Sequence, residues 1–143
     1  MKFTEFYLQE KLDGDDKPDY WFRYATPEDV VDLIKKKHSI ISMDNFKYVD
    51  TPDDFIDISE VRKLNGFFGE KRKYRIDRDN NLAMFGNYTM KQWYEFLLSI
   101  ATTGLREPVL LSPNGTEIIE GNHRVQALHQ LGYKQVPVIY DRK

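Results

Sequence analysis

The sequence predicts an α+β fold in which a small mixed sheet packs against helices. Two observations predict it. Short apolar runs with strand composition alternate along the chain with segments that carry helix caps and helical spacing of apolar residues. A tight turn at residues 112–115 separates two of these strand-like runs and indicates a hairpin. The length of 143 residues suits one domain, or a compact domain with an extension.

Residues 1–54 are expected to form an N-terminal extension built from strand and helix. The first twelve residues alternate loosely, which is typical of an edge strand or a short helix, and an exposed turn follows them. Residues 20–24 have strand composition, and we expect this aromatic group in the core rather than as a surface for stacking bases. Thr26 is the expected N-cap of a helix that ends near His38.

Residues 55–143 are expected to form the main domain. Its first strand is placed at residues 55–58. Residues 65–87 are rich in glycine and charge, and they predict a long loop or a weakly structured hairpin.

The clearest helix follows Tyr88. Thr89 and Gln92 form a capping box, and Gly104 is the expected C-terminal stop. The apolar residues of this helix recur at helical spacing and should be buried: Met90, Trp93, Leu97 and Ile100.

The C-terminal elements are a hairpin, a helix and a last strand. The hairpin strands are placed at residues 108–111 and 116–120, and the helix runs from about Asn122 to Gly132. The last strand covers residues 136–140, and Pro137 indicates an edge position or a strand start.

Composition excludes several classes of protein. Cysteine is absent, which excludes disulfides, thiolate metal sites and thiol nucleophiles. There is no apolar run of membrane-spanning length and no apolar block at the N-terminus, so we expect a cytoplasmic protein that does not enter a membrane. The net charge of −2 has the wrong sign for a protein that coats nucleic acid. An acidic block at residues 44–60 precedes a basic block at 62–78; these are either solvated faces or a partner surface.

The expected functional site lies where the second hairpin strand gives way to a helix, in the stretch Glu120 to Arg124. A chain that leaves a strand through Gly121 and starts a helix presents backbone N–H groups and the positive end of the helix dipole to an anion. Asn122, His123 and Arg124 can add ligands to phosphate oxygens. Glu120 can hold a metal or accept a proton, so Glu120 and His123 are the candidate catalytic residues.

Structural roles compete for the same residues. Asn122 is a good N-cap, His123 can form local hydrogen bonds, and Arg124 can pair with Glu120. His129 lies six positions beyond His123 and therefore on another face of the helix, which argues against a paired metal site.

Three motifs in this order carry a resemblance to a known superfamily: SIATTGLREPVLL, IIEGNHRVQALHQLG and VPVIY. From about residue 55 to residue 140 the chain resembles the ParB/sulfiredoxin superfamily, a group that includes ParB-like nucleases. The resemblance implies a ParB/sulfiredoxin-like domain that binds nucleotide phosphates through Gly121, Asn122, His123 and Arg124. It also implies Mg²⁺ and a nucleoside triphosphate, ATP or CTP, as cofactors.

The motif departs from each branch of the superfamily. Sulfiredoxins have a box similar to Gly-Gly-Cys-His-Arg, and Asn122 stands at their cysteine, which excludes sulfinic-acid repair by that route. The CTP-binding partition proteins have Gly-Glu-Arg-Arg, which matches Gly121 and Arg124 only; they continue into a helix-turn-helix domain that we do not expect here. The free-serine kinases have an acid-Gly-His-Thr-Arg box, whose acid, glycine and arginine match Glu120, Gly121 and Arg124.

Two further residues follow from the resemblance alone. Ser99 matches a serine or threonine that sulfiredoxins place near the nucleotide. Arg62 matches the arginine after their first strand. Both are expected to contribute to nucleotide binding.

Two functions remain open. The first is an ATP- or CTP-dependent phosphotransferase or NTPase in which Glu120 assists the chemistry. The second is a phage- or plasmid-type module that binds nucleic acid or a host protein through the basic block, with ParB-like nuclease activity as a weaker form of it. Metal-dependent cleavage usually needs several acids, and Glu120 is the one local acid. The oligomeric state does not follow from the sequence.

Overall fold

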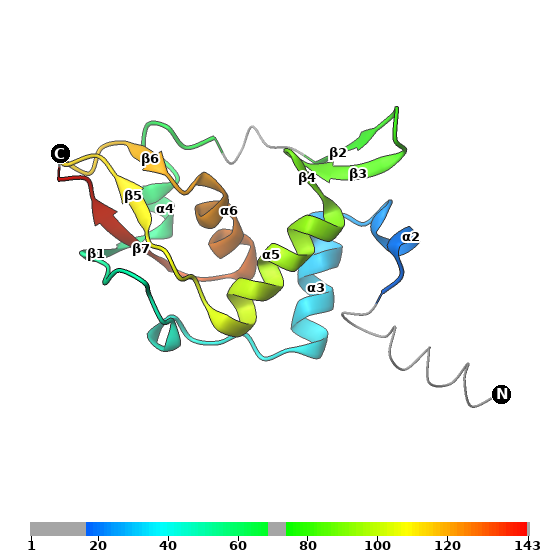
Figure 1. Ribbon diagram of the computed structural model, residues 1–143, viewed down its shortest axis with the longest axis horizontal. Helices are drawn as coiled ribbons and strands as arrows, with labels where there is room; N and C mark the ends of the chain where they lie inside the picture. Colours follow the sequence, from blue (N-terminus) through cyan, green and yellow to red (C-terminus); the bar gives the residue numbers. More distant parts are fainter. Residues whose placement is uncertain (1–16, 69–73, 143) are drawn as a thin grey trace.

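The computed structural model describes residues 17–68 and 74–142, in which two small sheets are joined by helices (Figure 1). The elements in chain order are α2 (Asp19–Phe22), α3 (Pro27–Lys37), the 3₁₀ turn η2 (Met43–Asn45), β1 (Asp54–Asp57), α4 (Ile58–Val61), β2 (Tyr74–Asp77), β3 (Leu82–Phe85), β4 (Tyr88–Thr89), α5 (Met90–Thr103), β5 (Val109–Leu111), β6 (Ile118–Glu120), α6 (Asn122–Leu131) and β7 (Gln135–Tyr140). The predicted α+β class is confirmed. The prediction for residues 1–12 lies outside the described residues.

The larger sheet has the strand order β1-β7-β5-β6. Strand β7 pairs antiparallel with β1 and parallel with β5, and β5 continues into β6 as the predicted antiparallel hairpin. The last strand is therefore internal, and the expectation that Pro137 marks an edge or a strand start is wrong.

Pro137 fits inside the sheet because its missing N–H falls where no ladder bond forms. Alternate residues of a strand direct their backbone groups to opposite neighbours. The Val138 carbonyl accepts a hydrogen bond from the Asp53 N–H, on the β1 side, at 2.8 Å. The nitrogen of Pro137 therefore faces β5. Pairing with β5 begins only at Val138, opposite Val109, so the proline precedes this ladder.

Helices cover one side of this sheet in successive layers. Helices α4 and α6 pack against it, α5 packs on α6, and α3 lies beside α5 (Figure 1). The predicted stripe of α5 is buried: Met90, Trp93, Leu97 and Ile100. Helix α3 precedes the expected boundary at Asp54, yet its apolar side chains join the same hydrophobic core as the main sheet. No helix within residues 17–68 and 74–142 is both long and apolar enough to span a bilayer.

The predicted threonine caps at the starts of α3 and α5 are confirmed. The Thr26 hydroxyl accepts a hydrogen bond from the Asp29 N–H, and the Asp29 carboxylate accepts one from the Thr26 N–H. Thr89 and Gln92 form the same reciprocal pair at the start of α5. Gly104 ends α5, as predicted. Each cap satisfies backbone N–H groups that the helix itself leaves without partners.

The strand predicted at residues 20–24 is wrong, because the chain there forms the short helix α2. Strand propensity of aromatic residues depends on what they pack against. Phe22 is buried and packs on Tyr94 of α5, with ring centroids 5.3 Å apart. Tyr20 and Tyr24 are exposed. Only part of this aromatic group therefore belongs to the core.

The smaller sheet has the order β2-β3-β4 and confirms a hairpin within residues 65–87. The Asp77 carboxylate shapes the turn by accepting hydrogen bonds from the Asp79 N–H and the Asn80 side chain. Asn81 takes a positive φ of 53°. Because β4 runs directly into α5, this sheet lies at the start of α5, at the opposite end of the molecule from the larger sheet (Figure 1).

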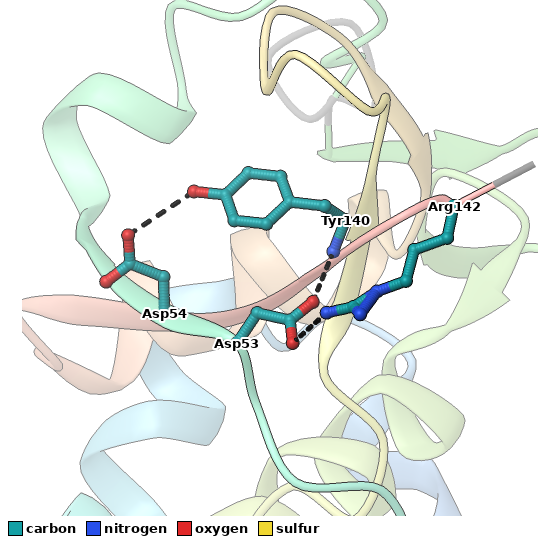
Figure 2. Close-up of polar contacts among 4 residues, drawn as sticks. All are labelled: Asp53, Asp54, Tyr140 and Arg142. Carbon is teal, nitrogen blue, oxygen red and sulfur yellow. Dashed lines mark hydrogen bonds and ion pairs between the residues drawn. The ribbon is translucent and has the colours of Figure 1, made fainter.

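Two aspartates hold the end of β7 (Figure 2). The Asp53 carboxylate accepts hydrogen bonds from the Tyr140 N–H at 3.0 Å and from the Arg142 guanidinium at 2.6 Å. The Tyr140 hydroxyl donates to the Asp54 carboxylate at 3.3 Å. The Tyr140 N–H, followed by Arg142, holds the pKa of Asp53 below its usual range.

We expect Asp53→Asn to destabilise the protein at neutral pH and to have a smaller effect at about pH 3. Because the pKa of Asp53 is lowered in the folded state, its contribution is present above the unfolded-state value of about 4 and is lost as pH falls through the folded-state value. Urea unfolding of wild type and variant at both pH values measures this. A loss of the same size at both would contradict the assigned role.

Two partly buried tyrosines differ in whether their hydroxyl has a partner. The Tyr133 hydroxyl donates to the Ile41 carbonyl at 2.6 Å. The Tyr48 hydroxyl oxygen is buried and has no hydrogen-bond partner among the described residues. Burial raises the pKa of both to about 12.

We therefore expect the two tyrosine-to-phenylalanine variants to shift stability in opposite directions. Tyr48→Phe removes an unsatisfied buried hydroxyl and should raise the free energy of unfolding by about 1 kcal/mol. Tyr133→Phe removes a hydrogen bond and should lower it by about 1 kcal/mol. Denaturant titration of both variants measures the difference, and shifts of the same sign would contradict the account.

Candidate functional site

Strand β6 ends at Glu120, and α6 begins two residues later, as predicted. The residue between them, Gly121, is the N-cap, with φ +116°, and it makes no side-chain cap bond. Asn122 is the first helical residue. The prediction that it is the N-cap is therefore wrong. The N–H groups of the first turn of this ten-residue helix have no acceptors within the helix itself, and the dipole makes this end positive.

Conformation favours a glycine at position 121, and the space for a side chain there is tight. Its φ lies in a region that side chains rarely adopt. A Cβ there would lie 3.1 Å and 3.2 Å from the two methyl groups of the buried Val109, and 3.3 Å from a guanidinium nitrogen of Arg124. The Arg124 guanidinium therefore lies directly beside the residue that opens the helix.

Arg124 is held at the start of β5. One guanidinium nitrogen donates to the Pro108 carbonyl at 3.3 Å, and another pairs with the Glu107 carboxylate at 3.0 Å. The expected alternative partner, Glu120, is not the one seen. The Arg124 side chain is 21% exposed, whereas the Glu107 side chain is 65% exposed. Solvent or a ligand can therefore reach this pair from the Glu107 side.

Asn122 bonds a loop to the start of α6. Its side-chain oxygen accepts from the Phe68 N–H at 2.5 Å, and its amide donates to the Gly66 carbonyl at 2.7 Å. The same loop bonds to β6, because the Ile118 N–H donates to the Asn65 carbonyl at 2.8 Å. A Cβ at Gly66 would lie only 2.6 Å from the Ile118 carbonyl oxygen. The loop can approach β6 this closely because Gly66 has no side chain. Asn122 thus ties residues 65–68 to the first turn of α6.

His123 packs inward against aromatic rings. Its ring lies edge-on to Tyr88, with centroids 4.7 Å apart, and 6.4 Å from the Trp93 ring. Its Nε2 atom is buried. In this conformation the imidazole links α6 to the start of α5, and that nitrogen does not reach solvent.

The remaining predicted residues lie on three different elements. Glu120 is exposed on the edge strand β6, opposite Leu110. Arg62 is half-buried at the C-terminal end of α4, which packs against α6. Ser99 is exposed on α5, about 9 Å along the helix from Trp93 by helical rise. Residues 120–124 form one strand-to-helix junction, whereas the hydrogen bond that Ser99 makes, from the Thr103 hydroxyl to its carbonyl, stays within α5.

A metal site was expected at Glu120. Within the described part of the chain, no three or more histidine, aspartate or glutamate side chains are grouped so that they could hold a metal ion. Mg²⁺ often takes one or two protein carboxylates and completes its shell with water and substrate phosphates. Glu120 alone could therefore hold Mg²⁺ only together with water and the phosphates of a bound nucleotide.

Three parts of the site were missed by sequence reasoning: the loop 65–68, the Glu107–Pro108 segment and Tyr88. The loop contacts depend on residues more than fifty positions apart, which no local pattern reports. The hairpin does contain a signal for Glu107. Its register, with Leu110 opposite Glu120, brings the residues before β5 close to the residues after β6.

No protein-family model, curated protein or solved structure matches this chain. The resemblance to the ParB/sulfiredoxin superfamily therefore stays a prediction from the sequence motifs.

Proposed function

We propose that the start of α6 binds the phosphates of a nucleoside triphosphate and that the protein is a phosphotransferase or an NTPase. One observation carries the proposal: a ten-residue helix begins behind a glycine at the sheet edge, with an arginine held beside that glycine. Backbone N–H groups, the helix dipole and a guanidinium then converge on the same place, which favours an oxyanion.

The Glu107 carboxylate occupies the Arg124 guanidinium that we expect to bind a phosphate. It is a carboxylate bound to the Arg124 guanidinium at 3.0 Å and mostly exposed, so it can be displaced at small cost. A phosphate carries more charge and more acceptor oxygens than a carboxylate, and it can also reach the amides of the helix start.

Phe68 supports a nucleotide rather than free phosphate. Its side chain is 48% exposed, and its backbone is bonded to Asn122, the first residue of α6. An aromatic residue whose backbone is bonded to the first residue of α6 can contact the base of a nucleotide whose phosphates lie at this helix start. Stacking tolerates any base, so this feature does not choose between ATP and CTP.

Glu120 is the residue we assign to the chemistry. It directly precedes Gly121, and its side chain is exposed, so it can hold Mg²⁺ on a bound triphosphate or orient the attacking group. A bound Mg²⁺ would supply neutralisation of the phosphate charge. Because the Nε2 atom of His123 is buried, we assign His123 to positioning α6 against Tyr88.

A thermal-shift series tests binding and chemistry separately. We expect ATP or CTP with Mg²⁺ to raise the Tm of the wild type more than inorganic phosphate does, since a ligand of the native state stabilises it. Release of phosphate or transfer to an acceptor is then measured on the same samples. Binding without turnover would leave a nucleotide-binding protein, and no shift with any nucleotide would contradict the proposal.

No observation favours the alternative nucleic-acid module. Arg62 and Lys63 follow α4, whereas Arg75 and Arg78 belong to the hairpin of the smaller sheet (Figure 1). The basic residues between these two groups lie outside the described residues. The described residues of the basic block are therefore divided between two parts of the fold.

A further inference from the structure

The outer edge of β2 has no strand beside it among the described residues, because β2 ends the order β2-β3-β4. Ile76, in the middle of this strand, lies opposite Ala83 of β3. Residues opposite each other in a sheet point to the same face. Ala83 is 1% exposed, but Ile76 is 39% exposed. An apolar side chain on the core-facing side is thus left open at the sheet edge.

The backbone of Ile76 also points to this edge. The Ala83 N–H donates to the Arg23 carbonyl at 2.8 Å, so the backbone groups of Ala83 are directed away from β2. In an antiparallel ladder, a residue whose groups point away lies in a non-hydrogen-bonded pair. The groups of Ile76, and by alternation those of Tyr74, therefore face outward. An unpaired edge of this kind can accept another strand.

The charges of β2 select one way of pairing with a copy of itself. In an antiparallel pair, residues whose backbone groups face outward must lie opposite each other on the two strands. This leaves three alignments of β2 with β2 of a second copy near the strand centre. One places Arg75 opposite Arg75 of the partner subunit, and another places Asp77 opposite Asp77 of the partner subunit; both oppose like charges. The third places Ile76 opposite Ile76 of the partner subunit, and each Arg75 then faces an Asp77.

We propose that this edge binds a second copy of the chain, with Ile76 on the two-fold axis and Arg75 paired with Asp77 of the partner subunit. The pairing covers both exposed isoleucines and satisfies the outward backbone groups. The Arg75 guanidinium donates to the Gly86 carbonyl at 2.7 Å and has further N–H groups to give. Tyr24, 60% exposed, is bonded to the same hairpin through Asn81 and adds apolar surface next to it.

An edge of four residues is short, so we expect a weak, reversible dimer with a Kd of about 10 µM to 1 mM. Other occupants of the edge, such as a different protein strand, would not follow the self-complementary register. The register is therefore the property to test.

Cysteine scanning reports the register directly, because the natural chain has no cysteine. In the proposed dimer, Ile76→Cys places two thiols on the axis with Cα atoms about 5.5 Å apart, within disulfide range. Arg75→Cys and Asp77→Cys place them about 8 Å apart, beyond that range. We expect oxidised glutathione to cross-link Ile76→Cys at least tenfold faster than either control. Equal rates at the three positions, or faster cross-linking at position 75 or 77, would overturn the proposal.

A charge exchange tests the same pairing without a covalent bond. Arg75→Asp and Asp77→Arg each oppose like charges across the edge and should sediment as monomers at concentrations where the wild type associates. A mixture of the two restores both pairs and should associate again. Because the Asp77 carboxylate also accepts hydrogen bonds in the turn, circular dichroism of each variant alone checks that the protein still folds. Two folded single variants that fail to associate in the mixture would contradict the proposed contact, as would single variants that associate like the wild type.

Discussion

Replacing Arg124 by alanine is expected to weaken nucleoside triphosphate binding by about tenfold to a hundredfold, the range of a charge-assisted hydrogen bond. The guanidinium lies beside Gly121, where the N–H groups of α6 also converge, so its removal takes the strongest side-chain ligand from the site. Isothermal titration calorimetry with ATP and CTP measures the affinity.

A second substitution separates this role from a structural ion pair. Glu107→Gln keeps the guanidinium but removes the carboxylate that competes with phosphate, so it should tighten binding by about two- to fivefold. Lys91→Ala is the matched control, because it breaks another surface ion pair, between α5 and Asp19 of α2 at 2.6 Å. It should leave affinity unchanged. If Glu107→Gln and Arg124→Ala weakened binding equally, the pair would serve only the fold.

Gly121→Ala is expected to lower the free energy of unfolding by about 2–4 kcal/mol. A side chain at φ +116° costs about 1–3 kcal/mol, and the added Cβ meets the buried Val109 at 3.1 Å. Gly132→Ala, at the other end of α6, is the control. It also has a positive φ, of 91°, but a Cβ there meets nothing within 4 Å, so only about 1 kcal/mol is expected.

Denaturant unfolding of both glycine variants gives the difference between them. The excess at position 121 measures how tightly the helix start is packed on β5, and it should accompany a loss of nucleotide affinity, because the new Cβ also lies 3.3 Å from the Arg124 guanidinium. Equal losses of stability at positions 121 and 132 would show that packing at this junction is not tight.

Local signals predicted the elements whose partners are close in the chain. Thr26 and Thr89 cap their helices through residues three positions away, and the turn at 112–115 brings β5 and β6 together without help from the rest of the fold. Pro137 can lie inside the sheet because β5 begins to pair with β7 only at Val138. The residues of the last strand alone do not report this. Phe22 lies in a short helix and packs against Tyr94 of α5, more than seventy positions away, a contact that local residues do not report.

The candidate site divides in the same way. The glycine, the helix start and the stretch 120–124 followed from adjacent residues, and the structure places them as one junction. The hydrogen-bond partners of its side chains could not be predicted from adjacent residues. Asn122 binds a loop 54 to 56 positions away, and Arg124 binds Glu107 rather than Glu120. Side chains at a helix start find their partners in three dimensions, and residue spacing alone does not report them.

Backbone amide shifts give the most direct test of the proposed oxyanion site. In a ¹⁵N-labelled sample titrated with ATP and Mg²⁺, the amides of Asn122, His123 and Arg124 should show the largest shifts, saturating together with one Kd. Pyrophosphate should move the same amides, and the Phe68 amide should respond to ATP more than to pyrophosphate. Saturable shifts centred elsewhere in the chain, or none at these three amides at millimolar ATP, would contradict the account.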